Sequence, residues 1–309
     1  MMPSGSVYDP APLPRGHVEY SVRPVDLITC LYLLVNACLV LCWASRIESA
    51  YGYCAAFSSA AVAVMVIPPL CRCSTVPWVA FIGELYPIAG FTFQYMSTAV
   101  LNQASPLPWF DPWLAEIDRS LFGGLVCDRF STAIPHPLFA ESMAFFYFSY
   151  YLLIPSVSLI LWFKNRGLCL DCIFSMACSF YLFYLIFSLF PSAGPQFYAR
   201  QGAIEWKGFF FGPLLTSLLE NTELPTGSFP SSHVGIALAI TFFAWRFHRG
   251  LGVITAFLTS GLCFAILYGG PHYALDLPCG LVAGSVFLGL SRLISRTMKN
   301  VCRQKNHIP

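Results

Sequence analysis

The sequence has 309 residues, of which 57% are hydrophobic and only 10% are charged. Soluble domains usually carry about 25% charged residues, so this composition, with a mean hydropathy of +0.65, excludes an ordinary water-soluble protein. The formal net charge of +2 and the absence of a basic run before the C-terminal tail argue against a nucleic-acid partner. The composition therefore predicts an all-α, polytopic membrane helix bundle whose main solvent is lipid.

The N-terminal residues 1–25 include Pro3, Pro10, Pro12 and Pro14 together with scattered charges. We expect this segment to be a disordered cytoplasmic tail. No short apolar core with a small-residue cleavage site follows it, so a removable signal peptide is not expected. The first apolar helix should therefore anchor the chain.

Eight segments are long and apolar enough to be membrane-spanning helices. A helix needs about 20 mostly apolar residues to cross the hydrocarbon core. The sixth segment is short, so we expect its first turn to lie inside the protein, shielded from lipid. The segments are 26–46, 50–70, 77–101, 139–163, 168–190, 232–247, 251–268 and 275–296.

Lys and Arg residues divide unevenly between the two ends of these spans. Cytoplasmic loops carry an excess of Lys and Arg, so the richer side, which holds both termini, is expected to be cytoplasmic. The long loops 102–138 and 191–231 then lie on the exoplasmic side. The division is twelve against five: Arg15, Arg23, Arg72, Lys164, Arg166, Arg246, Arg249, Arg292, Arg296, Lys299, Arg303 and Lys305 against Arg46, Arg119, Arg129, Arg200 and Lys207.

Both long loops contain short amphipathic pieces. FFFGPLLTSLL at 209–219 predicts an interfacial or re-entrant segment, and FDPWLAEIDRSLFGG in the first loop predicts a short helix that lies in the membrane interface. In that helix, an apolar face is expected opposite a polar face: Trp113, Leu114, Ile117 and Leu121 opposite Glu116, Asp118 and Arg119.

Three polar clusters interrupt the apolar chain at the exoplasmic ends of spans. They are FPSAGPQFYAR (190–200), FPSSHVG (229–235) and YGGPHYALD (268–276). The expected topology places all three on the same face of the membrane. We therefore expect them to form one site.

The third cluster carries the most chemical information. His272 and Asp276 are four residues apart, so they share one face of a helix. The carboxylate can accept a hydrogen bond from one ring nitrogen and leave the other nitrogen as a nucleophile. His233 can protonate a leaving oxygen, and the helix N-terminus at Ser231 and Ser232 suits an anion. These residues indicate phosphoryl transfer through a phosphohistidine.

Two other interpretations remain for these residues. Each histidine taken singly is as typical of a helix cap or a packed core as of an active site. His233, His272 and Asp276 together favour an active site. Two histidines and a carboxylate also match a metal site. Activity that resists chelators but is inhibited by vanadate would separate phosphohistidine chemistry from metal chemistry.

The pairing of FPSSHVG with a following His-x-x-x-Asp resembles the second and third motifs of the type 2 phosphatidic acid phosphatase superfamily. DPWLAEIDRSLFG, PSAGPQFY and HYALD make the chain most similar to its inositol phosphorylceramide synthase branch. The resemblance implies a six-helix catalytic core at 77–296. Residues 26–76 then add two membrane helices, and residues 297–309 form a basic cytoplasmic tail.

The resemblance also implies a role for each site residue, without a metal or a cofactor. His272 is the expected nucleophile, Asp276 its orienting partner and His233 the general acid. The expected substrate-binding residues are Ser231, Ser232, Gln196, Tyr198 and Arg200.

The sequence departs from the phosphatase members in its cations. Those members carry a Ser-Arg pair ahead of the third-motif histidine, and a Lys and an Arg-Pro in the first motif. Here Ala265 and Ile266 occupy the positions of that pair, and the first cluster offers neutral Gln196, with Arg200 as the nearest cation. Bidentate arginines favour a phosphomonoester, which approaches two negative charges, over a singly charged phosphodiester. The sequence therefore predicts transfer of a phosphorylated head group from a phospholipid to a lipid alcohol such as ceramide or diacylglycerol.

Two alternatives belong to other function classes. One is a phosphatase of lipid phosphates or polyprenyl diphosphates, which the missing arginines disfavour. The other is a lipid-binding or transport protein on the same fold. A degenerate member of that kind is expected to lose a histidine or the aspartate, and all three residues are present.

Two features inside the spans favour structural roles. Glu84 lies in the third span near its cytoplasmic end, and we expect it to bond to a neighbouring helix, although intramembrane carboxylates are often functional. Tyr147, Tyr150 and Tyr151 form an aromatic cluster in the fourth span, which favours packing over substrate stacking.

Overall fold

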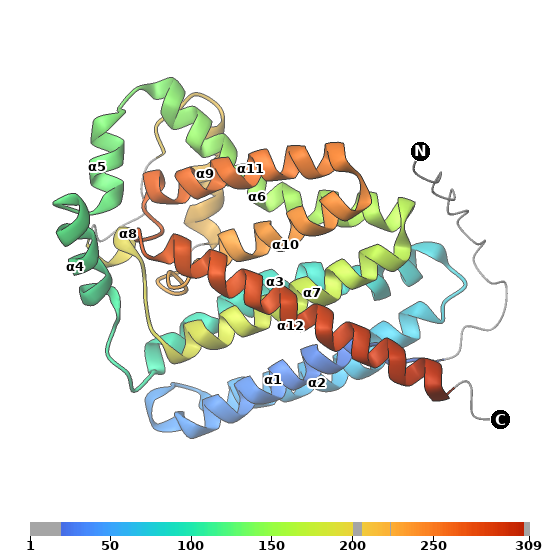
Figure 1. The fold of residues 1–309 in the computed structure, drawn as a ribbon. Helices are drawn as coiled ribbons and strands as arrows, with labels where there is room; N and C mark the ends of the chain where they lie inside the picture. Colours follow the sequence, from blue (N-terminus) through green and yellow to red (C-terminus); the bar gives the residue numbers. More distant parts are fainter. Residues whose placement is uncertain (1–19, 200–205, 223, 306–309) are drawn as a thin grey trace.

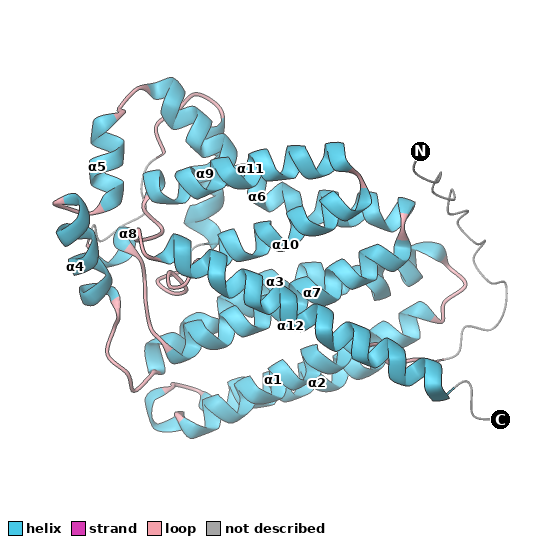
Figure 2. Ribbon diagram, viewed as in Figure 1, coloured by secondary structure: helices cyan, strands magenta, loops and turns pink. Residues whose placement is uncertain are grey.

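The computed structural model describes residues 20–199, 206–222 and 224–305. Within this part the chain forms twelve α-helices and one short 3-10 turn, with no strand, so the all-α prediction is confirmed (Figure 2). The long helices are α1 (Pro24–Cys42), α2 (Ala50–Arg72), α3 (Pro77–Ala104), α6 (Pro137–Lys164), α7 (Arg166–Leu189), α10 (Ser232–Phe247), α11 (Arg249–Gly269) and α12 (Asp276–Lys305). The short elements are η1 (Ala44–Arg46), α4 (Asp111–Phe122), α5 (Val126–Ala133), α8 (Pro195–Tyr198) and α9 (Phe211–Thr222).

Each of the eight expected spans is a helix, and six of them are long and apolar enough to cross a membrane. These six are α1, α2, α6, α7, α11 and α12 as far as Met298. Helix α10 is apolar but has only 16 residues, in line with the expected short sixth span. Helix α3 has 28 residues but is not among the six, and it buries polar side chains such as Glu84, Gln94 and Asn102. Six such helices fit an integral membrane protein.

The starts of the long helices follow local sequence signals. Pro24, Pro77 and Pro137 each stand in the first turn of a helix, where a missing N–H costs no hydrogen bond. The His136 ring and the Asn165 side chain accept hydrogen bonds from the first turns of α6 and α7, as N-cap residues do.

The loops that carry the polar clusters lie at one end of the bundle. Figure 1 shows α4, α5 and α8 together at that end, whereas α12 finishes at the opposite end. Helix α7 runs through the centre, with 72% of its most apolar window buried, compared with 22% for α2 and for α12. The less buried helices, such as α2 and α12, therefore present most of their apolar side chains to lipid.

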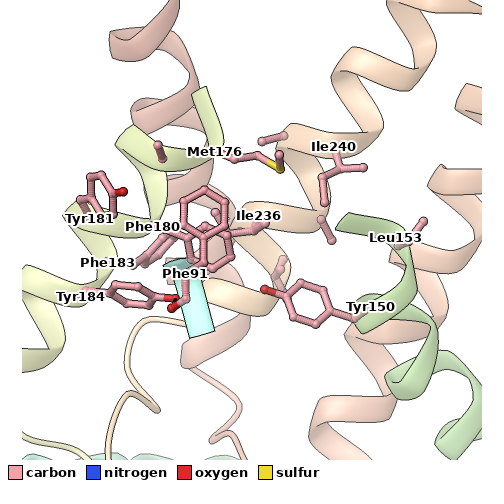
Figure 3. Close-up of a cluster of buried hydrophobic side chains, with 14 of the residues drawn as sticks. Phe91, Tyr150, Leu153, Met176, Phe180, Tyr181, Phe183, Tyr184, Ile236 and Ile240 are labelled. Atoms are coloured by element: carbon pink, nitrogen blue, oxygen red, sulfur yellow. Dashed lines mark hydrogen bonds between the residues drawn. The ribbon is translucent and has the colours of Figure 1, made fainter. Parts of the chain in front are cut away.

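The core around α7 is aromatic. Figure 3 shows Phe91 of α3 and Phe180 and Tyr184 of α7 near Ile236 of α10, with Tyr150 of α6 on the other side. The Phe91 and Phe180 rings lie 4.5 Å apart, and those of Phe180 and Tyr184 5.4 Å apart. This packing fixes α3, α6 and α10 against one central helix.

Small residues let α10 and α12 approach closely. A Cβ atom on Gly284 would lie 2.4 Å from the Gly235 Cα atom, and one on Gly280 would lie 2.4 Å from the Ser231 carbonyl oxygen. Neither position has room for a side chain. Spacing of small residues at every fourth position is typical of close helix pairs in membranes. The contact brings the first turns of α10 and α12 together.

Buried ion pairs tie the first three helices to α7, away from the polar clusters. Glu84 is 2% exposed and pairs with Arg23, which precedes α1, and with Arg166 at the start of α7, 2.6 Å away. Beside it, Asp26 of α1 pairs with Arg72 of α2. Glu84 therefore has the structural role that its sequence position favoured.

Replacing Glu84 with alanine leaves Arg23 and Arg166 without their carboxylate. Loss of one partner from a buried ion pair costs about 3 kcal/mol, so we expect a lower unfolding temperature in detergent while the folded fraction keeps its activity. The control is Glu116→Ala, because the pair of Glu116 with Arg119 is exposed and contributes little. Equal unfolding temperatures for the two variants would contradict this role.

Candidate active site

The structure brings His233, His272 and Asp276 together at the end of the bundle where the polar clusters meet. His272 lies in the loop before α12, Asp276 is the first residue of α12, and His233 is the second residue of α10. The His272 Nδ1 atom is 3.0 Å from Asp276 Oδ2, and the His272 Nε2 atom is 3.1 Å from His233 Nδ1. The three side chains therefore form one continuous chain of contacts.

Asp276 Oδ2 is the hydrogen-bond acceptor at one end of this series of contacts. It receives the Tyr273 backbone N–H at 2.9 Å and the Ser228 hydroxyl at 2.6 Å, in addition to the His272 ring. A backbone N–H can only donate, and several donors on one oxygen are typical of an ionised carboxylate. We therefore assign the His272 proton to Nδ1. The lone pair of His272 is then on Nε2.

The free nitrogen of His272 faces the other polar groups of the site. Nε2 lies 3.2 Å from the Ser231 hydroxyl as well as 3.1 Å from His233 Nδ1. His272 is 1% exposed, whereas His233 is partly exposed. Burial lowers the pKa of His272, which favours the neutral ring that a nucleophile needs. The arrangement suits nucleophilic attack by Nε2, with a second imidazole beside it to move a proton.

In the second polar cluster, FPSSHVG, the Ser231 side chain contacts the site as expected, but the Ser231 backbone N–H does not. Ser231 and Ser232 are both buried, and the Ser231 hydroxyl contacts His272. However, the Ser231 backbone N–H donates to the Asp276 carbonyl at 3.1 Å. This N–H binds α12 and is not available to an anion. The expectation that the helix N-terminus at Ser231 binds an anion is therefore wrong for this N–H group.

The first polar cluster lies against the third. The Gln196 backbone N–H donates to the Gly270 carbonyl at 3.1 Å, and Gly194 packs on Pro271 so closely that a Cβ atom would lie 2.4 Å from the Pro271 oxygen. Gln196 is buried and Tyr198 is 43% exposed. In the described part of the chain, no hydrogen bond joins Ser232 or Tyr198 to either histidine. Arg200 lies outside the described residues.

Helix α4 holds the first and third clusters in place through Asp111, a residue that sequence reasoning missed. Its carboxylate accepts hydrogen bonds from the Ala193 and Gly194 N–H groups at 2.9 and 2.8 Å. It also accepts one from the Tyr273 hydroxyl at 2.9 Å. Because the Tyr273 N–H binds Asp276, Asp111 is connected to the site through a single residue.

Asp118 makes a second connection from α4. It accepts hydrogen bonds from the N–H groups of Val126 at 2.9 Å and Ala274 at 3.0 Å. Burial raises the pKa of Asp118 and of Asp111, and the backbone hydrogen bonds partly offset this rise. Ala274 is two residues from Asp276, so Asp118 fixes the loop that carries His272.

Helix α4 forms where the short helix was expected, but the face that it buries against the protein is not the expected apolar face. Its buried face holds Asp111, Leu114, Ala115 and Asp118, while Trp113 and Leu121 are exposed. Asp118 was expected on the polar face, opposite Leu114, and its burial together with Leu114 corrects that expectation. A regular i, i+3, i+4, i+7 pattern that contained two aspartates was the available signal, and it was obscured because carboxylates rarely face inward.

The geometry does not favour the metal interpretation of the two histidines and the aspartate. Among the residues that the structure describes, no group of three His, Cys, Asp or Glu side chains is placed to hold a metal ion. Asp276 contacts the side of the His272 ring opposite to His233. The three side chains form a line and do not converge on one point.

Replacing Asp118 with alanine leaves the Ala274 N–H without its buried acceptor. Loss of such a bond costs about 2 kcal/mol, and small misplacements of reacting groups can cost about a hundredfold in rate. We expect kcat for turnover of a phosphate ester to fall by about tenfold to a hundredfold. Glu116→Ala, on the exposed side of the same helix, is the matched control. An Asp118→Ala protein with wild-type kcat would contradict the connection.

Comparison with protein families assigns most of this chain. A model of the PAP2 superfamily matches residues 112–294, which run from α4 into α12 and include His233, His272 and Asp276. Comparisons with curated proteins and with solved structures give no match. Superfamily members are phosphatases and phosphotransferases that act on phosphate esters. Because the match covers more than half of the sequence, the chain belongs to the PAP2 superfamily.

Proposed function

We propose that this protein transfers a phosphorylated head group from a phospholipid to a lipid alcohol such as ceramide or diacylglycerol. The observation that carries the proposal is the ordered contact from Asp276 through His272 to His233. It supplies a nucleophilic nitrogen, an orienting carboxylate and a neighbouring proton donor. Membership of the PAP2 superfamily supports chemistry on phosphate esters.

The first step forms a phosphohistidine. The His272 Nε2 lone pair attacks phosphorus, the bond from phosphorus to the leaving alkoxide breaks, and the alkoxide takes a proton from protonated His233 at Nδ1. Asp276 stabilises the positive charge that develops on His272. For this step the phosphoryl group displaces the resting contact between the two imidazoles.

The second step returns the enzyme to its starting state. The acceptor alcohol gives its proton to His233 Nδ1, and its oxygen bonds to phosphorus while the bond from phosphorus to nitrogen breaks. The head group is then joined to the acceptor lipid, and both histidines regain their initial protonation. One nitrogen of His233 thus acts first as acid and then as base.

The choice of a phosphodiester donor is supported by the missing cations. Ala265 and Ile266, which stand where phosphatase members carry a Ser-Arg pair, are fully buried in α11. The first cluster contributes neutral Gln196, which is also buried. A site with fewer cations suits a group with one negative charge better than one with nearly two.

The inositol phosphorylceramide synthase branch stays a prediction from the sequence. DPWLAEIDRSLFG and HYALD, two of the stretches that carry this resemblance, contact each other through the bond between Asp111 and Tyr273. This contact supports a shared role for them in building the site. Ceramide is therefore our preferred acceptor.

We also propose that both termini are cytoplasmic and that the site faces the exoplasmic side. The uneven division of Lys and Arg supports this orientation, as does the gathering of the three cluster-bearing loops at one end of the bundle (Figure 1). A phospholipid of that leaflet then reaches the site with its head group.

The test is transfer in vesicles that hold the purified full-length protein and one head-group-labelled phospholipid at a time. We expect label to move to ceramide or diacylglycerol when either is present, and His272→Ala to abolish the transfer. Denaturing the enzyme during turnover should trap label on the wild type and not on His272→Ala. We expect vanadate to inhibit the transfer and chelators to leave it unchanged.

Rapid hydrolysis of phosphatidic acid with intact phospholipids untouched would instead favour a phosphatase. Binding of phospholipid without any product would favour a lipid-binding or transport protein. Inhibition by a chelator would favour the metal interpretation of the histidines.

A further inference from the structure

We propose that Tyr147 of α6 is a positioning residue that reserves Nδ1 of His233 for proton transfer by binding its other ring nitrogen. Tyr147 lies outside the three polar clusters, and its sequence position favoured simple packing. The inference rests on the proposed function, because it assigns a partner to the general acid of that reaction.

The Tyr147 hydroxyl lies 3.5 Å from His233 Nε2, on the side of the ring opposite to the Nδ1 contact with His272. Tyr147 is fully buried, and a buried phenol hydroxyl needs a polar partner. The two rings meet edge to face, with centroids 5.3 Å apart and an angle of 77°. The contact thus extends the polar chain from Asp276 and His272 through His233 to the phenol.

A hydroxyl suits both protonation states of His233. It accepts a hydrogen bond from Nε2–H when the ring is charged, and it donates one to Nε2 when the neutral ring carries its proton on Nδ1. After Nδ1 gives its proton to the leaving alkoxide, the remaining proton on Nε2 still faces the Tyr147 oxygen. Nδ1 then presents its lone pair to the acceptor alcohol. Tyr147 therefore lets one nitrogen serve both steps.

The surroundings of Tyr147 hold its ring in place. Trp206 packs on it with ring centroids 5.6 Å apart, and Trp206 itself lies directly on Gly269, where a Cβ atom would be 1.9 Å from the indole. Glu141 holds the segment that follows Trp206 by accepting hydrogen bonds from the N–H groups of residues 209–212. These contacts fix the Tyr147 ring beside His233.

Tyr150 provides a matched comparison on the same helix. Its ring also packs on His233, with centroids 4.7 Å apart. Figure 3 shows its hydroxyl pointing into the apolar cluster toward Ile236 and Phe91. Removing either hydroxyl leaves an aromatic ring against His233, and only the Tyr147 change removes the polar contact to Nε2.

The experiment compares Tyr147→Phe, Tyr150→Phe and wild type on two substrates with the same head group. One is the phospholipid donor, whose alkoxide needs a proton in order to leave. The other is the p-nitrophenyl ester of the head-group phosphate, whose phenolate leaves without one. We expect Tyr147→Phe to lower kcat on the phospholipid by about tenfold to a hundredfold, with KM nearly unchanged. On the p-nitrophenyl ester, the burst of p-nitrophenolate in the first turnover reports the first step alone. We expect the rate of this burst to stay within about threefold of wild type.

Tyr150→Phe should keep both rates near wild type. Equal loss on both substrates in Tyr147→Phe, or wild-type rates on both, would overturn the inference and leave Tyr147 as a packing residue. The ¹⁵N shifts of the His233 ring, read on labelled protein without turnover, give a second measurement: they should change in Tyr147→Phe and not in Tyr150→Phe. If His272→Ala transfers the head group at the wild-type rate, the proposed function itself fails, whatever the tyrosine variants show.

Discussion

The site depends on the contact between the first turns of α10 and α12. The Ser231 N–H binds the Asp276 carbonyl, and Gly280 and Gly284 leave α12 no side chain to hold α10 away. This backbone contact carries His233 and His272 to within 3.1 Å of each other although they are 39 residues apart. Two helices that are separated in sequence by α11 thus share one end, and the chemistry is placed by backbone geometry before any side chain contributes.

In the described part of the chain, the buried carboxylates lie toward the two ends of the bundle. At one end, Glu84 and Asp26 are neutralised by arginines and hold α1, α2, α3 and α7 together. At the other end, Asp111 and Asp118 are bound by backbone N–H groups, and Asp276 by a histidine. A buried carboxylate needs partners of this kind because desolvation disfavours its charge. Arginine partners thus mark the end of the bundle that holds helices together, whereas backbone N–H and histidine partners mark the end that holds the candidate site.

Helix α4 lies at the periphery of the bundle but holds two loops of the candidate site in position. It lies across the end of the bundle (Figure 1) and contributes no residue to the trio of His233, His272 and Asp276. Its aspartates nevertheless bind the loops at Gly194 and Ala274. In the same way, Tyr147 lies outside the three motifs and acts on His233 from α6. The motif residues alone are therefore an incomplete description of the site.

Hydropathy predicted the helical segments well because burial in lipid demands long apolar stretches with internal hydrogen bonds. The spacing of His272 and Asp276 predicted their contact. The expected reason, a shared helix face, was wrong, because His272 lies in the loop before α12 and only Asp276 is helical. The sequence could not predict the inward face of α4, because Asp118 is buried only where the Val126 and Ala274 N–H groups reach it. In the same way, the sequence placed Ser231 at a helix N-terminus that suits an anion, but it could not show that the Asp276 carbonyl accepts the Ser231 N–H.

By itself, then, the sequence determined that the protein is a membrane helix bundle with its reactive side chains in three short clusters. Local forces set those properties: the length of apolar runs, the turn of the helix and the chemistry of imidazole and carboxylate. Only the tertiary structure decided which group each histidine nitrogen contacts, which aspartates face inward and which tyrosine reaches the site. Those properties depend on partners distant in the chain, and a partner exists only once the helices have packed.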